Sequence, residues 1–158
     1  MNGMPKPSDE HLKLHRLAGQ WEGKEILSPS PWGPGGEALG RYQGRVDLEG
    51  FFVIQDYVEE KEGKIVFRGH GIFGFDATDK KYTWYWVDSM GSVPAQPSRG
   101  EWIGDTLTFE STFPQGRGRY TYRFEGADTY HFRLENSFDG GQSWTKLMEG
   151  TYHRKSGA

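Results

Sequence analysis

The segment RYTYRFEGADTYHFRLE, residues 119–135, decides the fold class, because two runs of alternating side chains lie on either side of a short turn. Bulky apolar side chains occupy every second position of both runs: Tyr120, Tyr122, Phe124, Tyr130, Phe132 and Leu134. Charged or small polar residues stand between them, a period of two that is typical of strands with one buried face. Gly126-Ala127 suits the turn, so the segment predicts an antiparallel hairpin with an aromatic inner face.

Runs of the same kind continue along the rest of the chain. Strands are expected near residues 20–28, 37–49, 51–60, 64–75, 81–88, 99–103, 106–111, 117–125, 128–136 and 143–153. Short turn signals such as Glu62-Gly63 separate them, so that neighbours in sequence pair as hairpins. About ten strands in such an up-and-down meander would leave exposed edges unless the sheet closed, which predicts one barrel. The segments 28–36 and 89–98 are then rim loops.

The residues before the first strand predict one short helix. Residues 1–7 form a Pro-marked tail, Ser8 can cap a helix over residues 8–17, and Gly19 ends it. The barrel is expected over residues 20–153, and a chain of 158 residues matches a single domain.

The composition excludes several classes of function. The sequence has no cysteine, so it offers no disulfide, thiolate metal site or cysteine nucleophile, and a reducing compartment is expected. A formal net charge of -3, with basic residues scattered among acidic ones, argues against nucleic-acid or anionic-membrane partners. No stretch resembles a signal core or approaches the roughly 18 apolar residues of a membrane span. We therefore expect a cytoplasmic protein whose partners are small molecules or a second copy of the chain.

Two further segments carry a resemblance to known proteins. LAGQWEG at 17–23, directly after the expected helix, resembles the Gly-x-Trp entry of the lipocalin or calycin superfamily. HGIFGFDATDKKYTWYWVDSMGS at 70–92, together with KLMEGTYHR at 146–154, makes the chain similar to an uncharacterised family of bacterial lipocalin-like barrels. The resemblance implies an all-β fold, a single antiparallel up-and-down lipocalin-like barrel of about ten strands with a short N-terminal helix. It brings no assigned activity.

SFDGGQSW at 137–144 resembles the Asp-box hairpin of sialidase-type propellers. A propeller needs at least about four blades of four strands, and we find one copy of the motif, so sugar chemistry is not expected. Asp139 can instead bond the backbone amides of a turn, with Trp144 packed beneath it.

The inner face of the later strands is the candidate binding surface. Leu107, Phe109, Met148 and Tyr152 join the aromatic residues of the opening segment, although Lys146 falls on the same parity as Met148 and disturbs the pattern. Such an interior can hold an apolar ligand and offer hydroxyls to its polar end, or the aromatic side chains can simply fill the barrel. The candidate ligand contacts are Trp86, Asp88, Met90, His70, Phe109, Tyr120, Tyr122, Tyr130, Phe132 and Tyr152.

Two of these candidates have alternative roles. Asp88 shares a parity with Trp86 and could face the pocket mouth, where it would suit proton transfer or a cationic ligand. It could equally bond the amides that follow it and fix a turn. His70 lies between glycines that allow a ligand to approach closely, or it is a polar position beside a bulge.

No catalytic or metal site emerges from the remaining polar residues. His11 and His15 stand four residues apart on the helix, but no third metal ligand lies nearby. Glu59 and Glu60 point to different faces of a strand and form no acid/base pair. Ser89 lacks the context of a nucleophile elbow.

Four functions remain open. We prefer a binding module for a small hydrophobic or aromatic molecule that needs no cofactor. The alternatives are an enzyme of the same fold, in which Asp88, His70 or a phenol moves a proton, and a dimeric scaffold. The resemblance to the calycin superfamily also implies a haem-binding barrel, in which His153 or His131 could ligate the iron.

Overall fold

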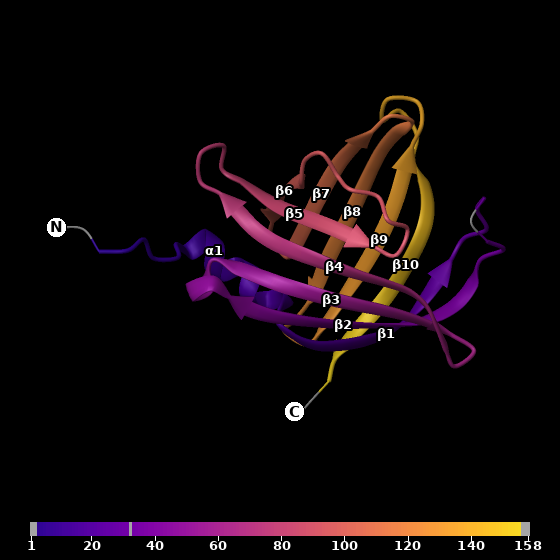
Figure 1. Ribbon diagram of the computed structural model, residues 1–158, viewed down its shortest axis with the longest axis horizontal. Helices are drawn as coiled ribbons and strands as arrows, with labels where there is room; N and C mark the ends of the chain where they lie inside the picture. Colours follow the sequence, from indigo (N-terminus) through magenta and orange to yellow (C-terminus); the bar gives the residue numbers. More distant parts are fainter. Residues whose placement is uncertain (1–2, 32, 156–158) are drawn as a thin grey trace.

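The structure, a computed structural model that describes residues 3–31 and 33–155, is a closed antiparallel barrel of ten strands with a short N-terminal helix, as the sequence predicts (Figure 1). The strands are β1 (Gly19–Leu27), β2 (Gly36–Asp47), β3 (Phe52–Lys61), β4 (Lys64–Asp76), β5 (Lys81–Asp88), β6 (Ser98–Ile103), β7 (Thr106–Phe113), β8 (Gly116–Glu125), β9 (Thr129–Ser137) and β10 (Thr145–Arg154). Three parts of the chain lie outside the described residues: residues 1–2 of the expected tail, Trp32 of the first expected rim loop, and residues 156–158.

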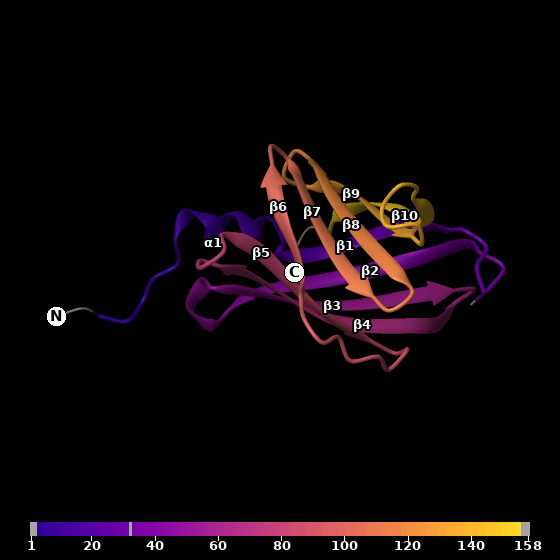
Figure 2. The ribbon, with the colours of Figure 1, turned by 90° about the horizontal axis from the view of Figure 1, so that it is seen from above.

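Each strand pairs with its neighbours in sequence, and β1 closes the barrel by pairing with both β2 and β10. Trp21, for example, lies opposite Tyr42 on one side and Arg154 on the other. In two perpendicular views β1–β4 run along the molecule while β7–β9 cross them obliquely (Figures 1 and 2). The shortest seam joins β5 to β6, where residues 82–84 pair with residues 98–100.

The expected helix over residues 8–17 is divided. The α-helix α1 covers Asp9–Lys13, and a 3-10 turn, η1, covers Leu14–Leu17. A second 3-10 turn, η2 (Leu48–Gly50), joins β2 to β3. Leu14 and Leu17 are buried in the barrel core, so η1 covers one end of the barrel. In the described part of the chain no helix is long and apolar enough to cross a membrane.

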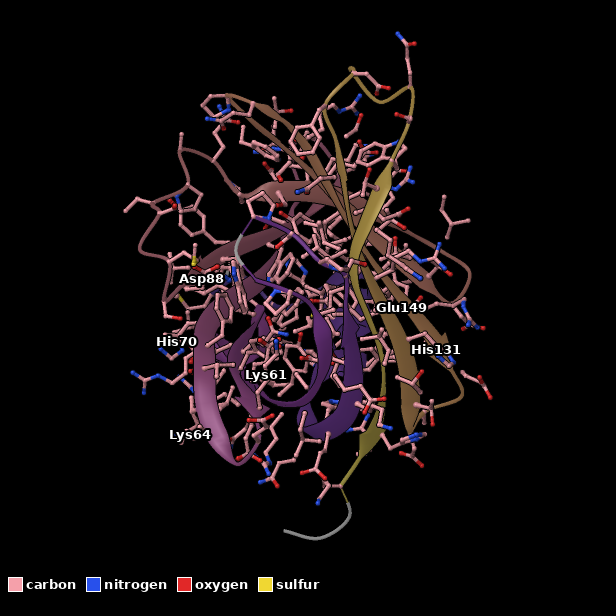
Figure 3. The ribbon with its side chains drawn as sticks, turned by 90° about the vertical axis from the view of Figure 1, so that its right-hand side faces the viewer. Lys61, Lys64, His70, Asp88, His131 and Glu149 are labelled. Atoms are coloured by element: carbon pink, nitrogen blue, oxygen red, sulfur yellow. The ribbon has the colours of Figure 1, made fainter. Side chains whose placement is uncertain are left out.

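The two ends of the barrel are therefore different. We call the end covered by η1 the helix end. The opposite end, the loop end, carries the connections between β1 and β2, β3 and β4, β5 and β6, β7 and β8, and β9 and β10. Figure 3 looks toward the loop end, with Lys61 near the middle of the view.

The parity conflict between Lys146 and Met148 has a structural cause. The register of β10 against β9 shifts between these two residues, so a bulge separates them. A bulge adds one residue to one strand and turns the side chains beyond it to the other face. Lys146 is thus exposed while Met148 is buried in the core.

The SFDGGQSW segment forms the connection between β9 and β10. Asp139 Oδ1 accepts hydrogen bonds of 2.9 Å from the Ser143 amide and the Ser137 hydroxyl. Together with the hydrogen bond from the Ser143 hydroxyl, which has the largest effect, these bonds lower the pKa of Asp139 to about 2. Trp144 packs 4.1 Å from the guanidinium of Arg119. The segment is a turn fixed by one carboxylate.

Candidate functional site

A buried carboxylic acid, Glu25, lies inside the barrel. It stands on the inner face of β1, and its exposed fraction is 0%. Gly40, on the adjacent strand β2, leaves the space for this side chain, because a Cβ atom there would lie 2.1 Å from Glu25 Oε2. Glycine is therefore needed at position 40 because it leaves space for the Glu25 side chain, and not because a turn requires it.

Two phenols and a second acid surround Glu25. The Tyr57 hydroxyl, on β3, lies 2.8 Å from both carboxyl oxygens of Glu25 and 2.8 Å from Glu59 Oε2. The Tyr152 hydroxyl, on β10, donates to Glu25 Oε2. We call Glu25, Tyr57, Glu59 and Tyr152 the acid–phenol cluster. It joins three strands across the interior.

The hydrogen bonds of this cluster require a proton on one of its acids. A phenol has one hydrogen to donate, and an ionised carboxylate can only accept. If both Glu25 and Glu59 were ionised, one of their contacts with the Tyr57 oxygen would bring together two acceptors with no hydrogen between them. A proton on either carboxyl group provides the missing donor, so the pair holds one negative charge.

Burial acts in the same direction. Removal from water, followed by the contact with Glu59, raises the pKa of Glu25 to about 8, and the hydrogen bonds from Tyr152 and Tyr57 oppose these effects only in part. Burial also raises the pKa of Tyr57 and Tyr152 above the ordinary range of a phenol. The phenols are therefore donors at neutral pH, and Glu25 is a carboxylic acid rather than a carboxylate.

Aromatic rings border the cluster on the side of the loop end. The ring of Tyr57 lies 6.1 Å from that of Phe67 and 6.0 Å from that of Trp86. Phe67 is the cross-strand partner of Glu59. Phe67 and Trp86 are only partly buried, whereas Tyr57 below them is buried. The half-buried rings of Phe67 and Trp86 thus border the buried acids and phenols on the side of the loop end.

Two charged side chains mark the rim of this end, as Figure 3 shows. Asp88 accepts a 2.7 Å hydrogen bond from the Trp86 indole and a 2.9 Å bond from the Met90 amide. It therefore fixes the turn after β5, one of its two expected roles, and also orients Trp86. Lys61 donates to the Gly35 carbonyl oxygen at 3.4 Å, across the rim.

The structure divides the ten candidate ligand contacts into three groups. Five lie buried inside the barrel: Phe109, Tyr122, Tyr130, Phe132 and Tyr152. Trp86, Tyr120 and Asp88 are half-buried toward the loop end. Met90 is 59% exposed in the following loop, and His70 lies on the outside. Only Tyr152 among them belongs to the acid–phenol cluster.

His70, one of the candidate ligand contacts, lies on the outer face of β4. Its neighbours Gly69 and Gly71 are buried, so the alternation of β4 turns the imidazole outward. There Nδ1 lies 2.7 Å from Asp56 Oδ1. The glycines make room instead for indoles, since a Cβ at Gly69 would lie 2.2 Å from the Trp86 ring.

The histidines proposed for haem also lie on the outside. His131 contacts Thr151 and Glu125, and His153 contacts Thr129, all through outer side chains. These two residues do not fit a haem held inside the barrel, because their imidazoles cannot reach an interior iron. The residues that the structure describes contain no cluster of three or more metal-ligating side chains.

The outer wall carries a broad depression of about 930 Å³ over β1 and β7–β10. Arg119 and Arg133 line it, but each faces a glutamate, at 3.1 Å from Glu135 and 3.9 Å from Glu149 respectively. Ion pairs on a solvated sheet face contribute little energy, so this depression is a weaker candidate site than the acid–phenol cluster.

Glu25, Tyr57 and Glu59 are not among the site residues that the sequence predicts. Glu59 was compared with its neighbour Glu60, and the two do point to different faces, since Glu60 pairs with Arg41 outside. A usable signal was present in the parity that Glu25 shares with Trp21, and Glu59 with Tyr57. Acidic residues at inward-facing positions of a strand are candidate site residues, as are the aromatic residues beside them.

Comparisons with known proteins place these features in context. The profile of a family described as a protein of unknown function (DUF1579) matches residues 6–154. No curated protein matches the sequence. Rv2717c from M. tuberculosis has a similar structure, with a TM-score of 0.71 and 16% identity over 94% of this chain and 99% of that one. The S-type phycobiliprotein lyase CPES from Guillardia theta is also similar, with a TM-score of 0.65 and 10% identity over 96% of this chain and 95% of that one.

Proposed function

The chain belongs to the DUF1579 family, whose function is unknown, and we propose from the geometry of its interior that it binds a small, largely apolar molecule at the loop end of the barrel. The rings of Phe67 and Trp86 contact the apolar body of this molecule. The acid–phenol cluster receives its polar group.

The observation that carries this proposal is the buried acid pair. Burying a carboxyl group costs several kcal/mol unless it is fully bonded, and a core of apolar side chains would be more stable. Glu25 and Glu59 nevertheless lie inside a barrel whose other inner residues are mostly aromatic. A buried acid with a raised pKa beside half-buried aromatic rings is typical of functional sites.

A second candidate function rests on the same cluster. An acid whose pKa lies near neutrality and whose partners hold it in place can donate or accept a proton from a bound molecule. Glu25 has this property, and Tyr57 connects it to Glu59 near the rim. One structural neighbour is named a lyase, so a barrel of this architecture can support an activity. Proton transfer to a bound ligand is then the enzyme alternative, with Glu25 in place of Asp88 or His70.

The test is a binding experiment with a matched pair of variants. A library of small aromatic and aliphatic molecules that carry one polar group is titrated while the fluorescence of the six tryptophans, Trp86 among them, is recorded. We expect saturable binding with one-to-one stoichiometry. Glu59→Gln should weaken the best ligand about three- to tenfold, because one hydrogen bond to a charged group is lost. Glu60→Gln, one residue away but outside the barrel, should bind as the wild type does.

Two outcomes would contradict the proposal. One is a library without any saturable ligand. The other is an equal loss of affinity in both variants, which would mean that the acid inside the barrel plays no special part.

A further inference from the structure

We propose that the ligand of the loop-end site is a hydrophobic organic cation, an amine carried on an aromatic or aliphatic body. This inference rests on the proposed binding function and adds the charge of the ligand. Three observations support it: the charges at the loop end, the rings around them, and the oxygen of Glu59 that Tyr57 does not bond.

In the loop half of the interior, the acids have no buried basic side chain beside them among the residues that the structure describes. Glu25 and Glu59 face each other through Tyr57, and Asp88 stands at the rim on β5. Lys61, the charged residue that follows Glu59 on the same face of β3, binds the Gly35 carbonyl across the rim. Arg154 is also inward, but it stacks 4.2 Å from the Trp21 ring at the helix end. A positive ligand would therefore complement this charge.

The rings beside Glu59 suit a cation as well as an apolar body. The ring centroid of Tyr57 lies 6.1 Å from that of Phe67 and 6.0 Å from that of Trp86. An ammonium group over such faces is attracted by the ring quadrupoles, and the attraction grows as water is removed. Carboxylates beside a group of aromatic rings are a recurrent arrangement for recognising amines.

Glu59 has the oxygen that such a ligand needs. Its Oε2 accepts a hydrogen bond from Tyr57, and its Oε1 is the carboxyl oxygen that Tyr57 does not bond. Glu59 is 9% exposed, more than Glu25 beneath it. An ammonium group has three donors and can bond this oxygen while its carbon skeleton contacts Phe67 and Trp86.

Binding of a cation should also expel the shared proton. The ligand charge takes over the role of that proton, so both carboxyl groups ionise and the proton passes to the solvent. Besides Glu59, the groups that face Glu25 are phenols from four strands: Tyr42 on β2, Tyr57 on β3, Tyr130 on β9 and Tyr152 on β10. None of them provides a positive charge.

The test compares three probes that share a naphthylmethyl body and differ in the charge of the polar group. These are 1-naphthylmethylamine, 1-naphthalenemethanol and 1-naphthaleneacetate, titrated by calorimetry at pH 7 in phosphate and in Tris. We expect the amine to bind about tenfold more tightly than the alcohol, and the acetate more weakly than both. The heat of amine binding should differ between the buffers by the amount that proton release requires, with up to one proton per site.

Variants separate charge from shape. Glu59→Gln should remove both the preference for the amine and the proton release, while Glu60→Gln should keep both. Phe67→Leu leaves the charges intact and should reduce the preference for the amine about threefold, which provides a second test if Glu59→Gln does not fold. Circular dichroism establishes that each variant is folded.

The outcomes distinguish this inference from the function beneath it. If the alcohol or the acetate binds as tightly as the amine, or the amine binds without releasing protons, the cation inference is wrong and the binding function stands. If the library of the preceding test also yields no saturable ligand, the binding function itself fails.

Discussion

Tyr152 and Tyr122 are both fully buried phenols, yet their hydroxyl groups have different surroundings. The Tyr152 hydroxyl donates to Glu25. The Tyr122 hydroxyl is close to Gln55, but no hydrogen bond of normal geometry joins it to a partner. Removing a buried donor that has a partner leaves that partner without a hydrogen bond, which lowers stability. Removing a donor that has no partner leaves no other group unsatisfied.

We therefore expect opposite results from the same chemical change at these two residues. Tyr152→Phe should lower the free energy of unfolding by about 1–3 kcal/mol, and Tyr122→Phe should leave it unchanged or raise it. Urea denaturation followed by tryptophan fluorescence measures both. Equal losses in the two variants would show that ring packing, and not the hydrogen bond to Glu25, decides the stability.

The residues of the site were the part that the sequence revealed least. The period of two identified Tyr152 as an inward phenol, and the structure buries it inside the barrel. It could not reveal that Tyr152 and Glu25, which are 127 positions apart, share a hydrogen bond. That contact exists because β10 closes on β1, and alternation within one strand contains no information about its neighbour.

At the scale of elements, alternation predicted the strands well and their irregularities poorly. The strand expected over residues 81–88 has these bounds in the structure. The sequence indicated the bulge in β10 only indirectly. Lys146 and Met148 stand at positions of the same parity, although one side chain is charged and the other is apolar. A sequence shows such a conflict without showing which residue is inserted, because the bulge depends on the pairing with β9.

The connection between β9 and β10 offers a test at this scale. Asp139→Ala removes an acceptor of bonds from Ser137 and Ser143, so the midpoint of thermal unfolding should fall. Because these bonds lower the pKa of Asp139 to about 2, their contribution should persist at neutral pH and be lost only as the pH falls toward that value. Differential scanning calorimetry of the wild type and the variant measures the change.

Gln142→Ala, in the same turn, is the control and should leave the midpoint unchanged. Ligand binding at the loop end should survive in both variants. A variant of Asp139 with unaltered thermal stability and lost binding would contradict the structural role of the turn.

At the scale of the whole molecule, the closed barrel followed from the meander of short connections. The sequence did not show that one end is covered by Leu14 and Leu17 while the other end is bordered by half-buried rings. That asymmetry arises because the segment that precedes β1 packs Leu14 and Leu17 against one end of the barrel. The acid–phenol cluster lies between the aromatic core and the half-buried rings of the loop end, and the proton that it holds links the stability of the barrel to pH.

The sign of this linkage follows from Glu25. Its pKa is raised from an ordinary value of 4.5 to about 8, chiefly by burial. Between these values the folded protein holds a proton that the unfolded chain has released. Stability therefore falls as the pH rises through this window, and below it the contribution of Glu25 is fully present. One proton corresponds to a slope of at most about 1.4 kcal/mol per pH unit.

Glu25→Gln isolates this contribution, because an amide resembles the protonated acid and does not titrate. We expect the wild type and the variant to have similar unfolding free energies near pH 4.5, and the wild type to become steadily less stable than the variant as the pH rises toward 8. Urea denaturation at intervals of one pH unit measures the difference, in which the titration of the surface carboxylates cancels. A difference that stays constant across the range would mean that Glu25 is ionised inside the folded barrel. The acid pair would then share no proton, and Tyr57 would have to contact both carboxylates with a single hydrogen.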